Sequence, residues 1–150
     1  MLLLYRPSKL FERTEAEMTD QKLSWARPDE AFFAAGACHI LAFEFVRLSQ
    51  NPNYKIIFIK PKPEFGPVGT HVYVRNGDQA FDFNGWTDQV TLLTAHKRAC
   101  QEDNSNWDYD LIEITSDLET FSKENNHLLP TEFAHDPIPR AQRYIGLFKR

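Results

Sequence analysis

The chain has 150 residues, of which 42% are hydrophobic, and a formal net charge of −4. This length suits a single domain over residues 1–150 with a sizeable core. The hydrophobic share excludes a wholly disordered chain. Because the chain is acidic and its Lys and Arg residues are scattered, we expect no nucleic-acid partner.

The N-terminus reads MLLLYRP, with three consecutive leucines ahead of polar residues. This run is too short for the apolar part of a secretory signal and too short to cross a membrane. We therefore expect a cytoplasmic protein without a membrane partner, an expectation that leaves room for delivery by a specialised secretion system. In a reducing compartment Cys38 and Cys100 would be free thiols, since their spacing fits neither a disulfide framework nor a metal knuckle.

Two helix-prone segments lead to the most apolar part of the chain. Residues 8–20 are weakly amphipathic, and in residues 27–36 a proline with two acids behind it suits a first helical turn. Residues 38–50 place apolar side chains at i, i+3, i+4, i+7 and i+10, which predicts a largely buried helix. The sequence Asn-Pro-Asn at 51–53 predicts its end.

The second half of the chain alternates strands and helices. The segment GTHVYVRNGDQAFDFNG at 69–85 predicts a hairpin. The other expected elements are strands at 54–61 and 107–116, and helices at 88–101, at 116–126 with Ser116 and Glu119 as a capping box, and at the C-terminus. The predicted class is α+β, with a small antiparallel sheet packed against a buried central helix that carries Cys38.

The hairpin brings a histidine and an acid together. Asn76-Gly77 favours a two-residue type I′ turn, in which both central residues need positive φ. That turn places His71 directly opposite Asp82, on the face away from the apolar side chains. Opposed side chains have Cβ atoms roughly 5 Å apart, so the carboxylate can accept a hydrogen bond from the imidazole. The commoner role of such a pair is a polar contact on a solvated face.

Cys38 opens the most apolar helix. The first turn of a helix favours a thiolate, because the macrodipole and unpaired N–H groups are positive there. A neighbouring imidazole lowers a thiol pKa further, and a third group orients the imidazole. Backbone N–H groups at the helix start can also stabilise an oxyanion. The alternative is that Cys38 is a small hydrophobic residue of the core.

GACHILAFEF, followed by HVYVRNGDQAFDFNG, resembles the papain-like and transglutaminase-like cysteine hydrolase superfamily, especially its small bacterial members. The resemblance spans residues 36–86. It implies that Cys38 is the nucleophile, His71 the general base and acid, and Asp82 the orienting residue. Asn84 would be the third member if the hairpin register shifted by two residues. We expect no cofactor and no metal.

The chain departs from this superfamily in two ways. The interval from Cys38 to His71 is short compared with papain-type proteases, which suggests a trimmed core. Papain-like enzymes usually carry a glutamine a few residues before the cysteine to complete the oxyanion hole, and none stands there. The nearest upstream polar side chains are Gln21 and Ser24.

Other residues have a structural interpretation beside a functional one. Three aromatic residues are candidates for the walls of a substrate cleft, although core packing is commoner for such side chains: Trp25, Tyr73 and Trp86. His39 adjoins Cys38 but points about 100° away on a helix, so packing is expected. His96 and Cys100, four residues apart, would be two metal ligands without a third.

The expected function is a thiol-dependent amide hydrolase or acyltransferase, either a peptidase or a deamidase, acting on a protein, peptide or other amide. The alternative is a non-catalytic binding domain on the same scaffold, with a structural Cys38 and a structural His71–Asp82 pair. A third hypothesis is a metal site formed by His71, Asp82 and Cys38. The sequence does not indicate an oligomeric state.

Overall fold

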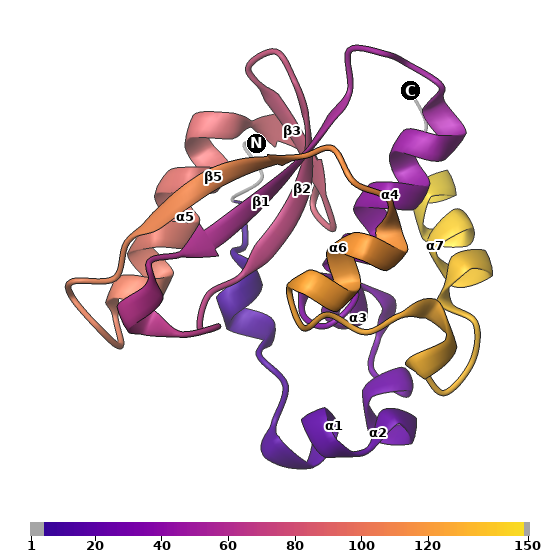
Figure 1. Ribbon diagram of the computed structural model, residues 1–150, viewed down its shortest axis with the longest axis horizontal. Coiled ribbons are helices and arrows are strands. Elements are labelled where there is room, and N and C mark those ends of the chain that lie inside the picture. Colours follow the sequence, from indigo (N-terminus) through magenta and orange to yellow (C-terminus); the bar gives the residue numbers. More distant parts are fainter. Residues whose placement is uncertain (1–4, 149–150) are drawn as a thin grey trace.

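The structure is a computed structural model that describes residues 5–148. The leucines at positions 2–4, on which the expectation about an export signal rests, lie outside these residues. Within the described range, five strands form an antiparallel sheet in the order β4-β3-β2-β1-β5, so the predicted α+β class is confirmed (Figure 1). The strands are β1 (Lys55–Pro61), β2 (His71–Asn76), β3 (Gln79–Asp82), β4 (Gly85–Asp88) and β5 (Tyr109–Ile114).

Helices cover both faces of the sheet, with α5 on one side and α4, α6 and α7 on the other (Figure 1). The helices are α1 (Glu15–Thr19), α2 (Gln21–Trp25), α3 (Asp29–Ala34), α4 (Cys38–Ser49), α5 (Gln89–Gln101), α6 (Leu118–Glu124) and α7 (Pro137–Ile145). Short 3-10 turns are η1 (Ser8–Phe11), η2 (Pro63–Phe65), η3 (Pro130–Glu132) and η4 (Gly146–Phe148). None of the helices in residues 5–148 has the length and apolar character needed to cross a membrane.

Both faces of the sheet are buried at β1, β2 and β3, because α5 covers the face that the sequence left solvated, whereas β5 is largely exposed. The α4 side of the sheet contributes Ile56, Phe58, Val72, Val74 and Phe81 to one core. The α5 side contributes Ile57, Ile59, Tyr73 and Ala80 to a second core with Leu92 and Trp107. His71 and Asp82 are therefore buried, with 0% and 3% of their surface exposed, so a solvated polar pair is the wrong description.

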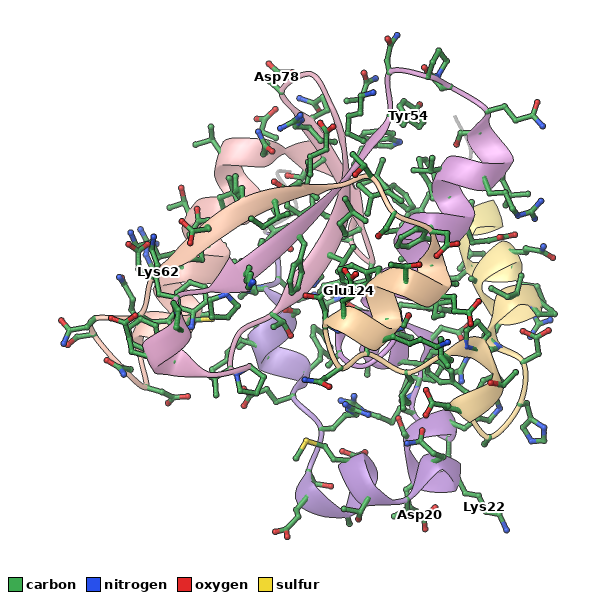
Figure 2. The ribbon with its side chains drawn as sticks, in the orientation of Figure 1. Asp20, Lys22, Tyr54, Lys62, Asp78 and Glu124 are labelled. Atoms are coloured by element: carbon green, nitrogen blue, oxygen red, sulfur yellow. The ribbon has the colours of Figure 1, made fainter. Side chains whose placement is uncertain are left out.

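The register of the hairpin differs from the predicted one by two residues. Asn76 pairs with Gln79, so Gly77 and Asp78 form the loop, and Figure 2 shows Asp78 at the tip of the hairpin. Gly77 has φ 61°, whereas neither Asn76 nor Asp78 has a positive φ. The turn thus follows the type II′ pattern, with glycine at the first central position, instead of the expected type I′.

The shift does not move any side chain to the other face, because side chains alternate with a period of two. His71 and Asp82 remain on one face and are diagonal neighbours instead of directly opposed. Diagonal neighbours on a sheet lie roughly 7–8 Å apart at Cα, within reach of long or aromatic side chains. The contact between the two residues therefore survives the error in register.

Smaller differences concern the helix ends. The segment 8–20 contains η1 and α1, and α1 is capped by Thr14 in a capping box with Glu17. The cap of α6 is Asp117, whose carboxylate accepts a hydrogen bond from the backbone N–H of Thr120 at 2.8 Å, so the assignment of Ser116 was one residue early. β4 was not expected as a separate strand.

Candidate active site

Cys38 is the first residue of α4. Gly36, with φ 106°, occupies a backbone conformation that other residues rarely adopt, and it separates α3 from α4. Ala37 caps the helix without a side-chain hydrogen bond, so the backbone N–H groups of the first turn have no capping side chain. Cys38 is 6% exposed and lies in the wall of a cavity of about 560 Å³.

Two histidines present a ring nitrogen to this thiol. Nε2 of His39 donates to the carbonyl of Leu128 at 2.7 Å, and its Nδ1 is buried without a hydrogen-bond partner. Nδ1 of His127 donates to the carbonyl of Asn125 at 2.8 Å, which leaves Nε2 to interact with Cys38. One nitrogen of each ring and Sγ of Cys38 lie within 4.8 Å of one another.

The third imidazole belongs to the hairpin pair. Nε2 of His71 lies 2.9 Å from Oδ2 of Asp82, and Nδ1 of His71 is buried without a hydrogen-bond partner. The Tyr5 hydroxyl donates to the same Oδ2 at 2.5 Å. The backbone N–H of Asn84 donates to Oδ1 at 2.9 Å. Asn84 thus binds Asp82, and no hydrogen bond joins Asn84 to His71 among the described residues.

The electrostatics favour a thiolate at Cys38. Burial by itself would raise the pKa of this thiol, but its interactions with His127, His39 and His71 outweigh burial and hold the pKa well below its usual value. Burial likewise opposes the charged form of His71, yet Asp82 and Cys38 raise its pKa from 6.5 to about 9. The pKa of His127 is also raised, against burial, by Cys38. The two shifts, down for the thiol and up for the imidazoles, both favour an ion pair between thiolate and imidazolium.

The pair His96 and Cys100 has a structural role. Nε2 of His96 donates to the carbonyl of Gly69 at 2.7 Å, and its ring stacks on that of His71 with centroids 5.6 Å apart. Burial, followed by the charge of His71, lowers the pKa of His96 to about 4. Burial raises the pKa of Cys100 to about 11. The pKa values of the two thiols are thus shifted in opposite directions, down at Cys38 and up at Cys100.

The three aromatic residues expected to wall a cleft do not line the cavity beside Cys38. Trp25 packs on Phe32, and Trp86 packs on Phe81. Tyr73 is fully buried and donates its hydroxyl to Gln89. Tyr73 thus lies in a core, whereas Trp25 and Trp86 are partly buried against one. The cavity instead lies between residues 8–21, the start of α4, the loop before β2 and the segment after α6.

Of the two upstream polar side chains considered from the sequence, the structure brings one to the cavity. Gln21 lines it, and Oε1 of Gln21 is buried without a hydrogen-bond partner. Ser24 is 3% exposed and does not line it. His127, Tyr5 and Arg13, which also surround the site, were not indicated by any sequence motif, since they stand far from Cys38 or His71 in the chain.

A metal ion could be held by the group Cys38, His39 and His127. In tetrahedral zinc sites with bonds of about 2.0–2.3 Å, neighbouring ligand atoms lie roughly 3.3–3.7 Å apart, so these atoms would have to approach one another slightly. This group differs from the set of His71, Asp82 and Cys38 considered from the sequence, in which His71 and Asp82 bond to each other. Within residues 5–148, this is the only group in which three His, Cys, Asp or Glu side chains bring ligand atoms close enough together to hold a metal ion.

Comparisons with known proteins found no match to this chain. No protein-family model, no curated protein and no solved structure matches it. The assignment of function therefore rests on the arrangement of Cys38, His71, Asp82 and the cavity.

Proposed function

We propose that the protein is a thiol-dependent amide hydrolase or acyltransferase, related in mechanism to the papain-like and transglutaminase-like enzymes. Cys38 would be the nucleophile, His71 the base and acid, and Asp82 the residue that orients His71. The observation that carries this proposal is the thiol at the start of α4, which faces imidazoles and opens onto a cavity. Cysteine, imidazole and a carboxylate in this order form an activated nucleophile.

Acylation begins from the thiolate and imidazolium pair. Sγ of Cys38 attacks the carbonyl carbon of an amide, and the carbonyl π electrons move onto oxygen. When the tetrahedral intermediate collapses, the C–N bond breaks, and the proton on Nδ1 of His71 passes to the leaving nitrogen. Nδ1 suits this step because Nε2 is engaged by Asp82. Its distance to the thiol would shorten in the complex, as is common for catalytic hydrogen bonds.

Deacylation reverses these roles. Nδ1 of His71 takes a proton from water, and the resulting hydroxide attacks the thioester carbon. The C–S bond then breaks, which releases a carboxylic acid and restores the thiolate and the imidazolium. An amine in place of water would give transamidation by the same steps. The substrate is accordingly a protein, a peptide or another amide, cleaved at the main chain or at a side chain.

Two groups are suited to stabilise the oxyanion. The backbone N–H of Cys38 belongs to the first turn of α4, where such groups have no intrahelical partner. The side-chain amide of Gln21, in the wall of the same cavity, is the second donor that we propose. It would fill the role that the residues immediately before Cys38 do not provide.

A non-catalytic binding domain is the rival function, favoured by the 6% exposure of Cys38 and by its place in the core around α4. Burst kinetics with p-nitrophenyl acetate separate the two. A catalytic Cys38 gives one equivalent of nitrophenolate rapidly, an acetyl group on Cys38 by mass spectrometry, and slower turnover that depends on His71. The Cys38→Ala variant is the control. Release no faster than in that variant would refute the enzyme.

A further inference from the structure

Arg13 lies in the wall of the cavity that contains Cys38. Its guanidinium lies against Gly36, two residues before Cys38, where an added Cβ would be 3.1 Å from Cζ of Arg13. The side chain is half-buried. Burial and the charge of Arg27 disfavour its cationic form, whereas Cys38 favours it. The guanidinium is thus close enough to the thiol for each to affect the other electrostatically.

The charge of Arg13 has no direct partner in the described part of the chain, where it makes no hydrogen bond and no ion pair. The other cation of the cavity wall, Lys9, pairs with Glu12 at 2.5 Å and with Asp103 at 2.6 Å. The acid that favours the charge of Arg13 is Glu17, whose carboxylate pairs with Arg27. A partly buried charge without a partner is unfavourable, so this wall of the cavity is suited to an anion.

We propose that Arg13 forms a carboxylate-binding site beside Cys38. On the proposed function, on which this inference rests, the preferred substrate is an amide that carries a carboxylate within a few bonds of the scissile carbon. Arginine suits this role because its planar fork matches a carboxylate with two parallel hydrogen bonds. A carboxylate bound there lies beside the residue that opens α4, and so beside the attacking sulfur.

A different role for Arg13 would be to stabilise the thiolate itself. The two roles predict different responses to two alkylating reagents, neutral iodoacetamide and anionic iodoacetate. A group that only stabilises the thiolate changes both rates by the same factor. A group that binds carboxylates changes the rate of iodoacetate by the larger factor, and so changes the ratio of the two rates.

The experiment measures both alkylation rates at Cys38 by mass spectrometry, with glutathione in the same tube to correct for the intrinsic reactivity of each reagent. We expect the corrected ratio of iodoacetate to iodoacetamide to fall about tenfold in Arg13→Met, which is the size expected for loss of one charge-assisted hydrogen bond. Arg13→Lys, which keeps the charge without the fork, should retain part of the ratio. Lys9→Met removes a cation of the same wall whose charge is already paired with two acids. This variant should keep the ratio within about twofold of the wild-type value. Circular dichroism and thermal melting verify that each variant folds.

Three outcomes are distinct. A high ratio that depends on Arg13 supports the carboxylate site. Fast labelling of Cys38 by iodoacetamide, with a ratio equal to that of glutathione and unchanged in Arg13→Met, overturns the carboxylate site and leaves the proposed hydrolase intact. Labelling of Cys38 no faster than that of Cys100 by either reagent overturns the hydrolase and, with it, the site that would serve it.

A second arm identifies which carboxylate binds. N-acetylglutamine has a free α-carboxylate and a side-chain amide, whereas its isomer N-acetylisoglutamine has an α-amide and a side-chain carboxylate. Each is tested for protection of Cys38 against iodoacetamide. Protection that disappears in Arg13→Met supports the proposal, and the isomer that protects tells whether a chain-terminal or a side-chain carboxylate is recognised.

Discussion

Replacing Asp82 by asparagine should lower the pKa of His71 while preserving the shape of the site. The pKa of His71 rises from 6.5 to about 9 in the folded protein, which corresponds to about 3 kcal/mol in favour of the imidazolium. Burial opposes this rise, and Asp82 and Cys38 produce it. If the Asp82 carboxylate and the Cys38 thiolate contribute equally to this rise, each contributes at least about 1.5 kcal/mol, because together they must also overcome burial. The titration midpoint of His71 should therefore fall by about one pH unit or more in Asp82→Asn, and similarly in Cys38→Ser.

The assay is nuclear magnetic resonance of the protein labelled with ¹⁵N at histidine, titrated with pH. In the wild type, His71 should remain an imidazolium at neutral pH and titrate near 9, while His96 stays neutral down to about 4. The reasoning is refuted if His71 titrates near its ordinary value in the wild type, or if Asp82→Asn leaves its midpoint unchanged.

The same pair determines how stability depends on pH. The pKa of His71 is raised on folding, so its contribution is fully present below about pH 6.5 and is lost as the pH rises through about 9. The pKa of Cys38 is lowered, so its contribution is present above the ordinary thiol value and is lost as the pH falls through its folded value. In the wild type, the stability that His71 loses as the pH rises is therefore offset by the stability that Cys38 gains over the same range. In Cys38→Ser the His71 contribution remains without that of the thiol, so urea unfolding should show stability falling from about pH 6.5 upward. A flat profile would contradict the stabilisation of the His71 imidazolium by Asp82.

Two further substitutions test the surroundings of the site. Gly69→Ala should cost more than about 2 kcal/mol in urea unfolding, since Gly69 has φ +90° and an added Cβ would lie 2.7 Å from the ring of Trp107. Gly66→Ala, at φ +59° and ψ −141° with nothing within 4 Å of the added Cβ, should cost only the backbone strain, about 1–3 kcal/mol. Equal costs for the two variants would show that contact with Trp107 is unimportant. Tyr5→Phe removes a hydrogen bond to Asp82 and should cost about 1–2 kcal/mol. A stability unchanged by Tyr5→Phe would mean that the Asp82 carboxylate does not need this donor.

The periodic parts of the chain were predictable. The apolar spacing from residue 38 onward gave the position of α4, and runs of β-branched and aromatic residues gave β1 and the hairpin. The contact of His71 with Asp82 was found from the hairpin, and it tolerated an incorrect turn because a shift of two residues keeps both side chains on one face. Face and approximate position are thus better determined by sequence than register.

The surroundings of Cys38 could not be predicted, since they come from segments far away in the chain. His127 reaches the thiol from the segment after α6, Tyr5 reaches Asp82 from the N-terminal segment, and Arg13 precedes α1. Local patterns carry no information about such contacts. The place of the aromatic rings could not be predicted for a related reason: a large apolar side chain has the same local pattern in a core as beside a ligand.

The reactivity of Cys38 in the wild type tests the central claim most directly. The rate of its alkylation by iodoacetamide is measured from about pH 4 to about pH 10 by mass spectrometry, with Cys100, whose pKa is raised to about 11, as the reference within the same chain. The proposed site predicts rapid labelling of Cys38 with a midpoint well below the ordinary thiol value, while Cys100 labels slowly throughout. A Cys38 that labels only as Cys100 does, or only in denaturant, would contradict an activated nucleophile.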